Sequence, residues 1–328
     1  MTELERPPFP THWDSTMVSA FKTCHRMGYH EFLQKIALFG TSPHLHAGGV
    51  LARGFEVARI SHWGPERCSP EQSITNAVRE MMAMYGEYIP PDWGNASNKS
   101  LNNCIYALLS YFDNYGWDTD PVQPLIKDDG FPAVEFRFSE VLDINHPVTG
   151  EPLVYCGRFD MFGVSREYGG ALYVVDEKTS ATLGASWSKQ WDLRSQFIGY
   201  TWAARRNDFP VLGAIVRGVG MLKTQITHLD AILQIPRWKV DQWHELTCIH
   251  LEKVIAAWKA GYWLQQYDDS CNAYGGCDFK ALCDTNNPQA YIGDYQSRVW
   301  DPLAQDPTHT GEQKQHQGFA SIAEEERK

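Results

Sequence analysis

The sequence predicts an α/β protein whose mixed β-sheet is flanked by helices and preceded by a helical N-terminal part. Three observations support this fold class. In the first third of the chain, the apolar residues recur with helical spacing. From residue 133 onward, short segments rich in Val, Phe and Tyr are typical of strands. A helical segment then separates a first group of strands from a second, which is the order of a mixed α/β core.

The individual elements follow from the same patterns. Helices are expected at residues 15–39, 48–60, 70–84, 101–115, 187–205 and 240–264. Strands are expected at residues 133–141, 153–160, 171–178, 211–222 and 227–234. Gly169 and Gly170 lie between the second and third strands and predict a turn there. These two strands would then pair as a hairpin.

Four parts are expected along the chain. They are a helical N-terminal part (1–120) that contains Cys24, an α/β core (121–265), a cysteine-containing segment (266–300) that packs on the N-terminal part, and a tail (301–328). The tail is polar and has few apolar residues, so we expect it to be disordered.

Composition narrows the class of protein. Hydrophobic residues make up 43% of 328 residues, enough for a sizeable core. The net charge of −11 argues against a broad basic surface for duplex DNA, although a local basic channel is compatible with it. The first ten residues are charged and Pro-rich, and no apolar run is long enough for a bilayer, so we expect a cytoplasmic protein without a membrane partner. In that reducing compartment, some of the eight cysteines are expected to bind a metal or a cluster.

Two carboxylates and a lysine are expected to converge at the ends of two neighbouring strands. Asp160 ends one strand, and Asp176 and Lys178 end the next, where alternation places the last two on one face. Two close carboxylates repel each other unless a cation lies between them, and Mg²⁺ or Mn²⁺ suits oxygen ligands. A metal there, with the lysine, could hydrolyse a phosphodiester. The alternative is that these are ordinary solvated residues, since Asp-x-Lys is frequent by chance.

A third motif follows on the next predicted helix. Gln196 and Tyr200 are four residues apart and therefore share one helix face. The chain thus carries Gly-x-x-Asp at 157–160, Asp-x-Lys at 176–178 and Gln-x-x-x-Tyr at 196–200. This order resembles the RecB-like branch of the PD-(D/E)XK nucleases, which implies a restriction-endonuclease-like fold.

The resemblance also implies roles for individual residues. Asp160, Asp176 and the backbone carbonyl of Glu177 would hold the metal, and Lys178 would be the catalytic lysine. Gln196 and Tyr200 would support the lysine and the DNA strand, or would simply be polar residues on a helix that packs against the sheet.

The family's first helix motif is matched in part. Gly48 and Glu56 fit it, but the family's histidine ligand, four residues after the glycine, is Ala52 here. Either the carboxylates alone hold the metal, or Glu56 or His46 takes the place of that histidine. Glu135, on the preceding strand, is a further candidate carboxylate or an ordinary surface charge.

Three late cysteines, Cys271, Cys277 and Cys283, are separated by five residues each. Cys24 is the best fourth thiol, and the set resembles the iron–sulfur branch of the same nucleases, which includes the AddB nuclease domain and CRISPR adaptation nucleases. That likeness implies a [4Fe–4S] cluster joining the two ends of the chain. Structural Zn²⁺ and free thiols are the alternatives, although paired Cys-x-x-Cys hooks are absent. The other four are expected to be small buried hydrophobes: Cys68, Cys104, Cys156 and Cys248.

The resulting hypothesis is a stand-alone, Mg²⁺- or Mn²⁺-dependent DNA exonuclease that acts on single strands or DNA ends in recombination, repair or end processing. No helicase P-loop is present, so a helicase or recombination partner would be a separate protein. Phage and CRISPR settings both fit. The main alternative is a catalytically inactive DNA-binding or assembly module with the same fold, and a second is a zinc-stapled protein of unrelated function.

Overall fold

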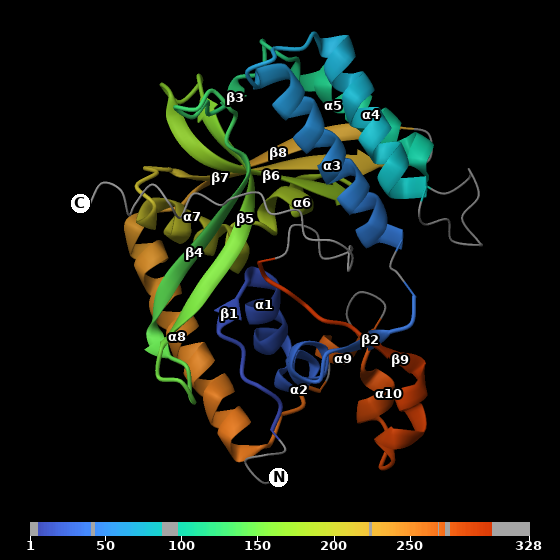
Figure 1. Cartoon of the computed structure of the whole chain (residues 1–328), viewed down its shortest axis with the longest axis vertical. Coiled ribbons are helices and arrows are strands. Elements are labelled where there is room, and N and C mark those ends of the chain that lie inside the picture. The colour runs from blue at the N-terminus through green and yellow to red at the C-terminus, as the bar shows by residue number, and fades with distance from the viewer. Residues whose placement is uncertain are drawn as a thin grey trace.

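The protein is built around one mixed β-sheet, seen edge-on near the centre of Figure 1. The computed structural model describes residues 6–40, 43–86, 98–222, 225–267, 269–272 and 276–303, so most of the tail expected at 301–328 lies outside it. The seven strands of the sheet are β1 (His12–Trp13), β3 (Val122–Pro124), β4 (Val134–Asn145), β5 (Pro152–Ser165), β6 (Ala171–Ser180), β7 (Gly213–Met221) and β8 (Ile226–Gln234). A separate antiparallel pair joins β2 (Ile36–Leu38) to β9 (Tyr295–Ser297).

Parallel and antiparallel pairs are mixed across the sheet. β4–β5, β5–β6 and β7–β8 are antiparallel, whereas β6–β7 and β1–β5 are parallel. The parallel β6–β7 pair needs a crossover, which is provided by α6 (Ala185–Lys189) and α7 (Ser195–Arg206). The predicted class, a mixed sheet flanked by helices, is therefore confirmed.

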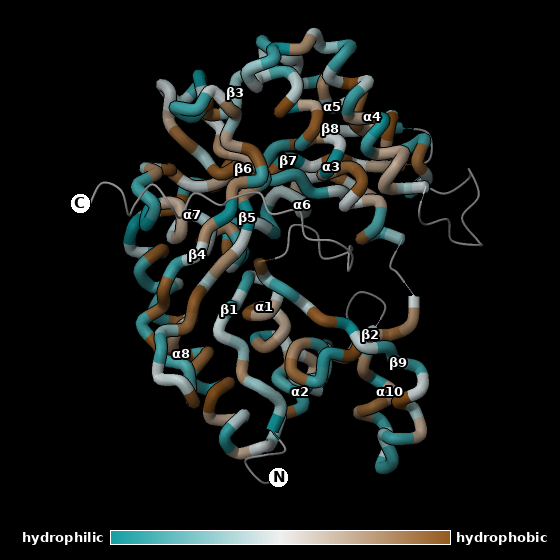
Figure 2. The backbone as a smooth tube through the Cα atoms, viewed as in Figure 1, coloured by the Kyte–Doolittle hydropathy of each residue, from teal (hydrophilic) through white to brown (hydrophobic). Residues whose placement is uncertain are grey.

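Helices cover both faces of the sheet (Figure 1). One face carries α3 (Pro43–Trp63), α4 (Pro70–Gly86) and α5 (Leu101–Tyr115), which share a core with the end of β7. The other carries α1 (Ser15–Thr23), α7 and α8 (Arg237–Ala260), whose core includes β5, β6 and the start of β7. Hydrophobic and hydrophilic stretches alternate along α8 in Figure 2, as expected for a helix with one buried side. None of the helices described is long and apolar enough to span a membrane.

The β5–β6 hairpin forms as predicted. Gly169 and Gly170 have φ values of +65° and +84°, a left-handed conformation that glycine adopts without strain. The pairing runs from Ser165 opposite Ala171 to Met161 opposite Val175.

The expected helix at 15–39 is wrong. The chain forms α1, turns extended at Cys24 (φ −161°, ψ 120°), and continues through α2 (His25–Gly28) and a π-helical turn (Tyr29–Leu33) into β2. The break has a tertiary cause, because the N–H of Arg26 donates to the carbonyl of Leu264. The chain is thereby held to the C-terminal segment at the point where Cys24 lies.

Two other helix predictions need correction. The helix expected at 187–205 is two helices, since turns at 190–194 bring Trp191 into the core. The helix expected to reach residue 264 ends at Ala260, because Gly261 adopts the left-handed conformation that terminates helices. The short strands β1, β2, β3 and β9 were not predicted, since two or three residues carry no alternating pattern.

The C-terminal segment lies beside the N-terminal helices. It contains α9 (Asp269–Asn272), α10 (Lys280–Cys283) and a 3₁₀ helix (Pro288–Asp294). Phe279, Leu282 and Tyr295 form a small core with Met27 and Ile36. The described part of the C-terminal segment therefore packs against residues that follow Cys24 in the chain.

We predict that Gly199→Ala lowers the free energy of unfolding by about 1–3 kcal/mol. An added Cβ in α7 would lie 2.5 Å from Cζ2 of Trp243 and 2.6 Å from the hydroxyl of Tyr155. Gly48→Ala in α3 is the matched control, because its Cβ would meet nothing within 4 Å. It should raise stability by up to about 1 kcal/mol through helix propensity. Urea unfolding measures both, and equal effects would contradict the packing at Gly199.

Candidate functional site

Three carboxylates lie side by side across the middle of the sheet. On β4 and β5, Val134 pairs with Met161 and Phe136 with Phe159, so Glu135 stands opposite Asp160. On β5 and β6, the last pair is Met161 with Val175, so Asp160 stands next to Asp176. Glu135, Asp160 and Asp176 therefore occupy one row over three adjacent strands. Like charges opposite each other are destabilising unless cations compensate them.

Lys178 supplies one such cation. Its Nζ lies 2.6 Å from Oδ2 of Asp176, as expected for residues two apart on a strand. Only 1% of the Asp176 side chain is exposed, while 31% of Lys178 is, so the lysine caps the buried carboxylate from the solvent side.

Helix α7 brings Gln196 and Tyr200, the third motif, next to the Asp176–Lys178 ion pair. The amide of Gln196 donates to Oδ1 of Asp176 over 3.4 Å and to the hydroxyl of Tyr200 over 3.1 Å. Phe197, between them in sequence, is buried, and the Lys178 ammonium lies 6.0 Å from its ring centre. The structure thus gathers Asp160, Asp176, Lys178, Gln196 and Tyr200, which the sequence had assigned to one site.

Burial controls the charges of this cluster. Together with the nearby Asp160 carboxylate, it raises the pKa of Asp176 to about 7 despite the opposing effect of Lys178. Burial also raises the pKa of Asp160, again against Lys178. Burial lowers the pKa of Lys178, but Asp176 and Asp160 outweigh it and hold that pKa above its ordinary value. Negative charge is therefore costly here, and an added cation would be favourable.

The side chain and the main chain of Glu177 face different partners. Its carboxylate points to the opposite face of the sheet, into a buried group with Arg59 and Tyr111. Its N–H donates to Oδ2 of Asp160 over 3.3 Å. In an extended strand the N–H and C=O of one residue point to the same side. The carbonyl predicted to bind metal is therefore on the edge of β6 that faces Asp160.

The two residues considered as substitutes for the family histidine, Glu56 and His46, have contacts of their own. Glu56 binds Arg53 over 2.7 Å, and Arg53 also binds Glu80 over 3.0 Å. His46 is buried against Tyr85, with ring centres 5.1 Å apart. The place of Glu56 in the metal site therefore stays a prediction.

Glu135 is the better placed carboxylate. It forms an ion pair with Arg158 and has a φ of +53°, a strained value for a non-glycine residue in a strand. Burial raises its pKa well above the ordinary value against Arg158, and Asp160 and Glu56 raise it further. Glu135 therefore interacts electrostatically both with Asp160 in the same row and with Glu56 of α3.

No three His, Cys, Asp or Glu side chains within the described ranges are arranged so as to hold a metal ion as they stand. At the carboxylates, ion pairs explain why the side chains are not arranged around a metal ion. Asp176 is held by Lys178, Glu135 by Arg158 and Glu56 by Arg53. Each of these three carboxylates already has a cation of the protein as its partner.

The four predicted cluster cysteines lie in one region. Burial raises the pKa of the Cys277 thiol, and the nearby Cys24, Cys283 and Cys271 thiols raise it further. The N–H of Gln266 donates to Sγ of Cys24 over 3.4 Å, and the thiol of Cys271 donates to the Gln266 carbonyl over 3.4 Å. One residue therefore connects the early cysteine to the first late one, although the thiols are not yet at ligand geometry.

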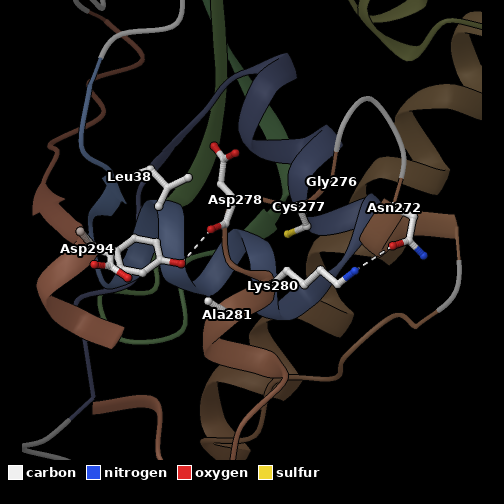
Figure 3. Close-up of a pocket in the computed structure, with 9 residues that line it drawn as sticks. Leu38, Asn272, Gly276, Cys277, Asp278, Lys280, Ala281 and Asp294 are labelled. Carbon is white, nitrogen blue, oxygen red and sulfur yellow. Dashed lines mark hydrogen bonds between the residues drawn. The ribbon is translucent and has the colours of Figure 1, made fainter. Parts of the chain in front are cut away.

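Cys277 also borders an open cavity of about 410 Å³. In Figure 3 its sulfur lies among the cavity residues, and Lys280 reaches Asn272. The hydroxyl of Tyr295, which also lines the cavity, donates to the Asp278 carbonyl over 2.7 Å. Space therefore exists beside the thiol. Of the cysteines expected to be buried hydrophobes, Cys104 and Cys156 are fully buried, and Cys68 and Cys248 are partly so.

Comparison with known proteins was made at three levels. No protein-family model matches the chain, and no curated protein matches it. One similar solved structure is described as "Crystal structure of SSO0001", with 12% identity, coverage of 71% of this chain and 84% of that chain, and a TM-score of 0.31. A TM-score this low carries no argument about fold or function.

Sequence reasoning missed the buried ionic group on the far face of the sheet. Its members are Arg59, Tyr111, Asp120, Glu177, Arg217 and Asp230. One signal was present, because Arg217 stands in a strand that is otherwise apolar and small. An arginine there must be paired.

We predict that Asp160→Asn raises the unfolding temperature by a few degrees in buffer with EDTA. The substitution removes a buried charge beside Asp176 and keeps an oxygen that accepts the Glu177 N–H. Asp143→Asn is the control, since that side chain is 89% exposed and should show little change. Differential scanning calorimetry measures both. A lower unfolding temperature for Asp160→Asn would mean that the metal-free fold tolerates this charge.

Proposed function

We propose that the chain is a metal-dependent DNA nuclease of the PD-(D/E)XK type, in the RecB-like branch with an iron–sulfur cluster. One observation carries the proposal. Asp160, Asp176 and Lys178 meet on adjacent strands, and Gln196 and Tyr200 reach the same point from the following helix. These five residues are the three motifs of the family, and separate elements bring them together.

Mg²⁺ or Mn²⁺ would be held by Asp160, Asp176 and the carbonyl of Glu177, and when bound it would neutralise phosphate charge and lower the pKa of a water. These oxygen donors fit Mg²⁺ or Mn²⁺, which prefer hard oxygen ligands. A bound cation would also offset the cost of burying the negative charges of Asp160 and Asp176. Lys178, charged and partly exposed, is placed to hold a water or a phosphate oxygen. Gln196 keeps Asp176 and Tyr200 in place through hydrogen bonds. The carboxylate that pairs with Lys178 is therefore held in a fixed position.

Single-stranded DNA or DNA ends are the proposed substrate, in recombination, repair or end processing, with exonuclease action. The support is the site itself, which lies at the solvent-facing end of Lys178. The net charge of −11 argues against a broad basic surface of the kind that binds duplex DNA non-specifically. A helicase or recombination protein is the proposed partner.

A [4Fe–4S] cluster is the proposed ligand of Cys24, Cys271, Cys277 and Cys283. The donor chemistry fits, since four thiols from the two ends of the chain gather around Cys277. The Gln266 N–H that donates to the Cys24 sulfur is a further fit, because iron–sulfur clusters are tuned by such bonds. Structural Zn²⁺ is the alternative for the same four thiols.

The nuclease assignment predicts that Asp176→Ala and Lys178→Ala each lower cleavage by a factor of about 10² or more. The assay is cleavage of end-labelled single-stranded DNA by anaerobically purified protein, with Mn²⁺ or Mg²⁺ and with EDTA. Asp143→Asn, on an exposed strand end, should retain full activity. Full activity of both site variants would refute the assignment, and the product ladder of the unchanged protein gives the polarity.

The cluster assignment predicts that Cys277→Ser purifies with less than about half of the iron of the unchanged protein and a weaker visible absorption. Cys248→Ser is the control, since that thiol is on α8 next to His244 and outside the group. Iron, zinc and sulfide analysis measures the outcome. Zinc without iron in the unchanged protein would favour the zinc-stapled alternative.

A catalytically inactive DNA-binding or assembly module is the second candidate. Ala52 favours it, because a methyl group stands where the family often has a histidine ligand. The retention of Asp160, Asp176 and Lys178 in one cluster argues against it. Iron-replete, folded protein that binds DNA but cleaves neither single strands nor duplexes would decide for the module.

A further inference from the structure

We propose that Arg59 is a positioning residue of the nuclease centre, acting through the Glu177 side chain on the peptide that would bind the metal. The proposal rests on the proposed function, since it concerns the same site. It assigns a task to the buried ionic group, which lies on the face of the sheet opposite Asp176 and Lys178.

Arg59 holds Glu177 with both ends of its guanidinium. Nη1 donates to Oε2 over 3.2 Å, and Nη2 donates to Oε1 in a closer contact. Arg59 is 2% exposed on α3, and the Glu177 side chain is 7% exposed. A two-pronged pair fixes the orientation of a carboxylate as well as its position.

Tyr111 of α5 locks this pair to the next strand. Its hydroxyl donates to Glu177 over 2.9 Å and accepts from Arg59 over 2.9 Å and from Arg217 over 2.8 Å. Arg217 in turn binds both oxygens of Asp120 at 2.7 Å. Glu177 and Arg217 are also register partners on the parallel pair β6–β7. The side chain of Glu177 is thus held directly by α3 and α5, and Tyr111 connects it to Arg217 on β7.

Fixing this side chain fixes the peptide that carries it. Glu177 lies between Asp176 and Lys178, and its N–H reaches Asp160 at the point where β5 and β6 stop pairing. Sheet hydrogen bonds from β5 no longer hold that edge of β6. The grip of Arg59 on the opposite face takes their place and keeps the Glu177 carbonyl beside Asp160.

Packing alone does not require these charges. Buried ion pairs cost desolvation, and apolar side chains of similar length often fill such sites equally well. A group that served only stability would therefore be replaceable by an apolar pair without effect on the metal. Groups that orient metal ligands behave differently, and their loss typically weakens metal binding by about 10- to 100-fold.

The test is the Mn²⁺ requirement of the Arg59→Met/Glu177→Met double variant, in which both charges are removed together. Mn²⁺ binding is measured directly by isothermal titration calorimetry in the absence of DNA. Single-stranded DNA cleavage is measured over the same Mn²⁺ range, with urea unfolding alongside. The expected result is a rise of about tenfold or more in the half-saturating Mn²⁺ concentration, with kcat at saturating Mn²⁺ retained within a few-fold. Tyr115→Phe is the matched control, because it removes the bond to Asp230 at the far end of the group and leaves Arg59 and Glu177 paired.

An unchanged Mn²⁺ requirement in the folded double variant would overturn the proposal. If the double variant does not fold, Tyr111→Phe replaces it, since it removes one hydroxyl from the same group and should raise the Mn²⁺ requirement in the same direction. An unchanged requirement there also overturns the proposal. Absence of metal-dependent cleavage by the unchanged protein would instead refute the proposed function itself.

Discussion

Three consecutive ionisable residues, Asp176, Glu177 and Lys178, lie in the middle of a buried strand, and the rest of the structure is arranged around their charges. Strand alternation sends the outer two to one face and Glu177 to the other. A buried charge is tolerated only with a partner, so each face must supply one. On one side Gln196 of α7 bonds to Asp176, and on the other Arg59 of α3 and Tyr111 of α5 hold Glu177. Both helical layers therefore converge on one tripeptide.

The N-terminal helix α1, which ends at Cys24, contacts the start of α7. The extended turn at Cys24 ends α1, and the ammonium of Lys22 on that helix reaches the Ser195 hydroxyl at the start of α7 over 3.4 Å. Ser195 also accepts from Trp243 of α8. A staple at Cys24 would thus restrain the same helix that presents Gln196 to Asp176. This links the cysteine region to the carboxylate row through one packed helix.

Local sequence determines much of the fold and the approach of Asp160 to Asp176 in the site. The helix at 101–115 was predicted to the residue, because Ser100 caps its start and Gly116 ends it. The β5–β6 hairpin and the approach of Asp160 to Asp176 followed from alternation and the glycine turn. The break at Cys24 could not be predicted, because its cause is a bond from Arg26 to Leu264, at the far end of the chain. The partners of Glu177 were equally hidden, since they come from α3 and α5.

Ala52 stands where the nuclease family that the chain resembles often has a histidine ligand. The cations that surround the carboxylate row show what its absence means for the charge of the site. A histidine would have brought a neutral donor to a row that already holds Glu135, Asp160 and Asp176. Without it the row is purely anionic, and its charge is balanced by Lys178 and Arg158, with Arg53 at Glu56. Oxygens that are paired in this way cannot also be arranged as a ready-made metal cage. The protein's own cations therefore offset part of the cost of burying this row, and a divalent ion bound there would compete with them for the same oxygens.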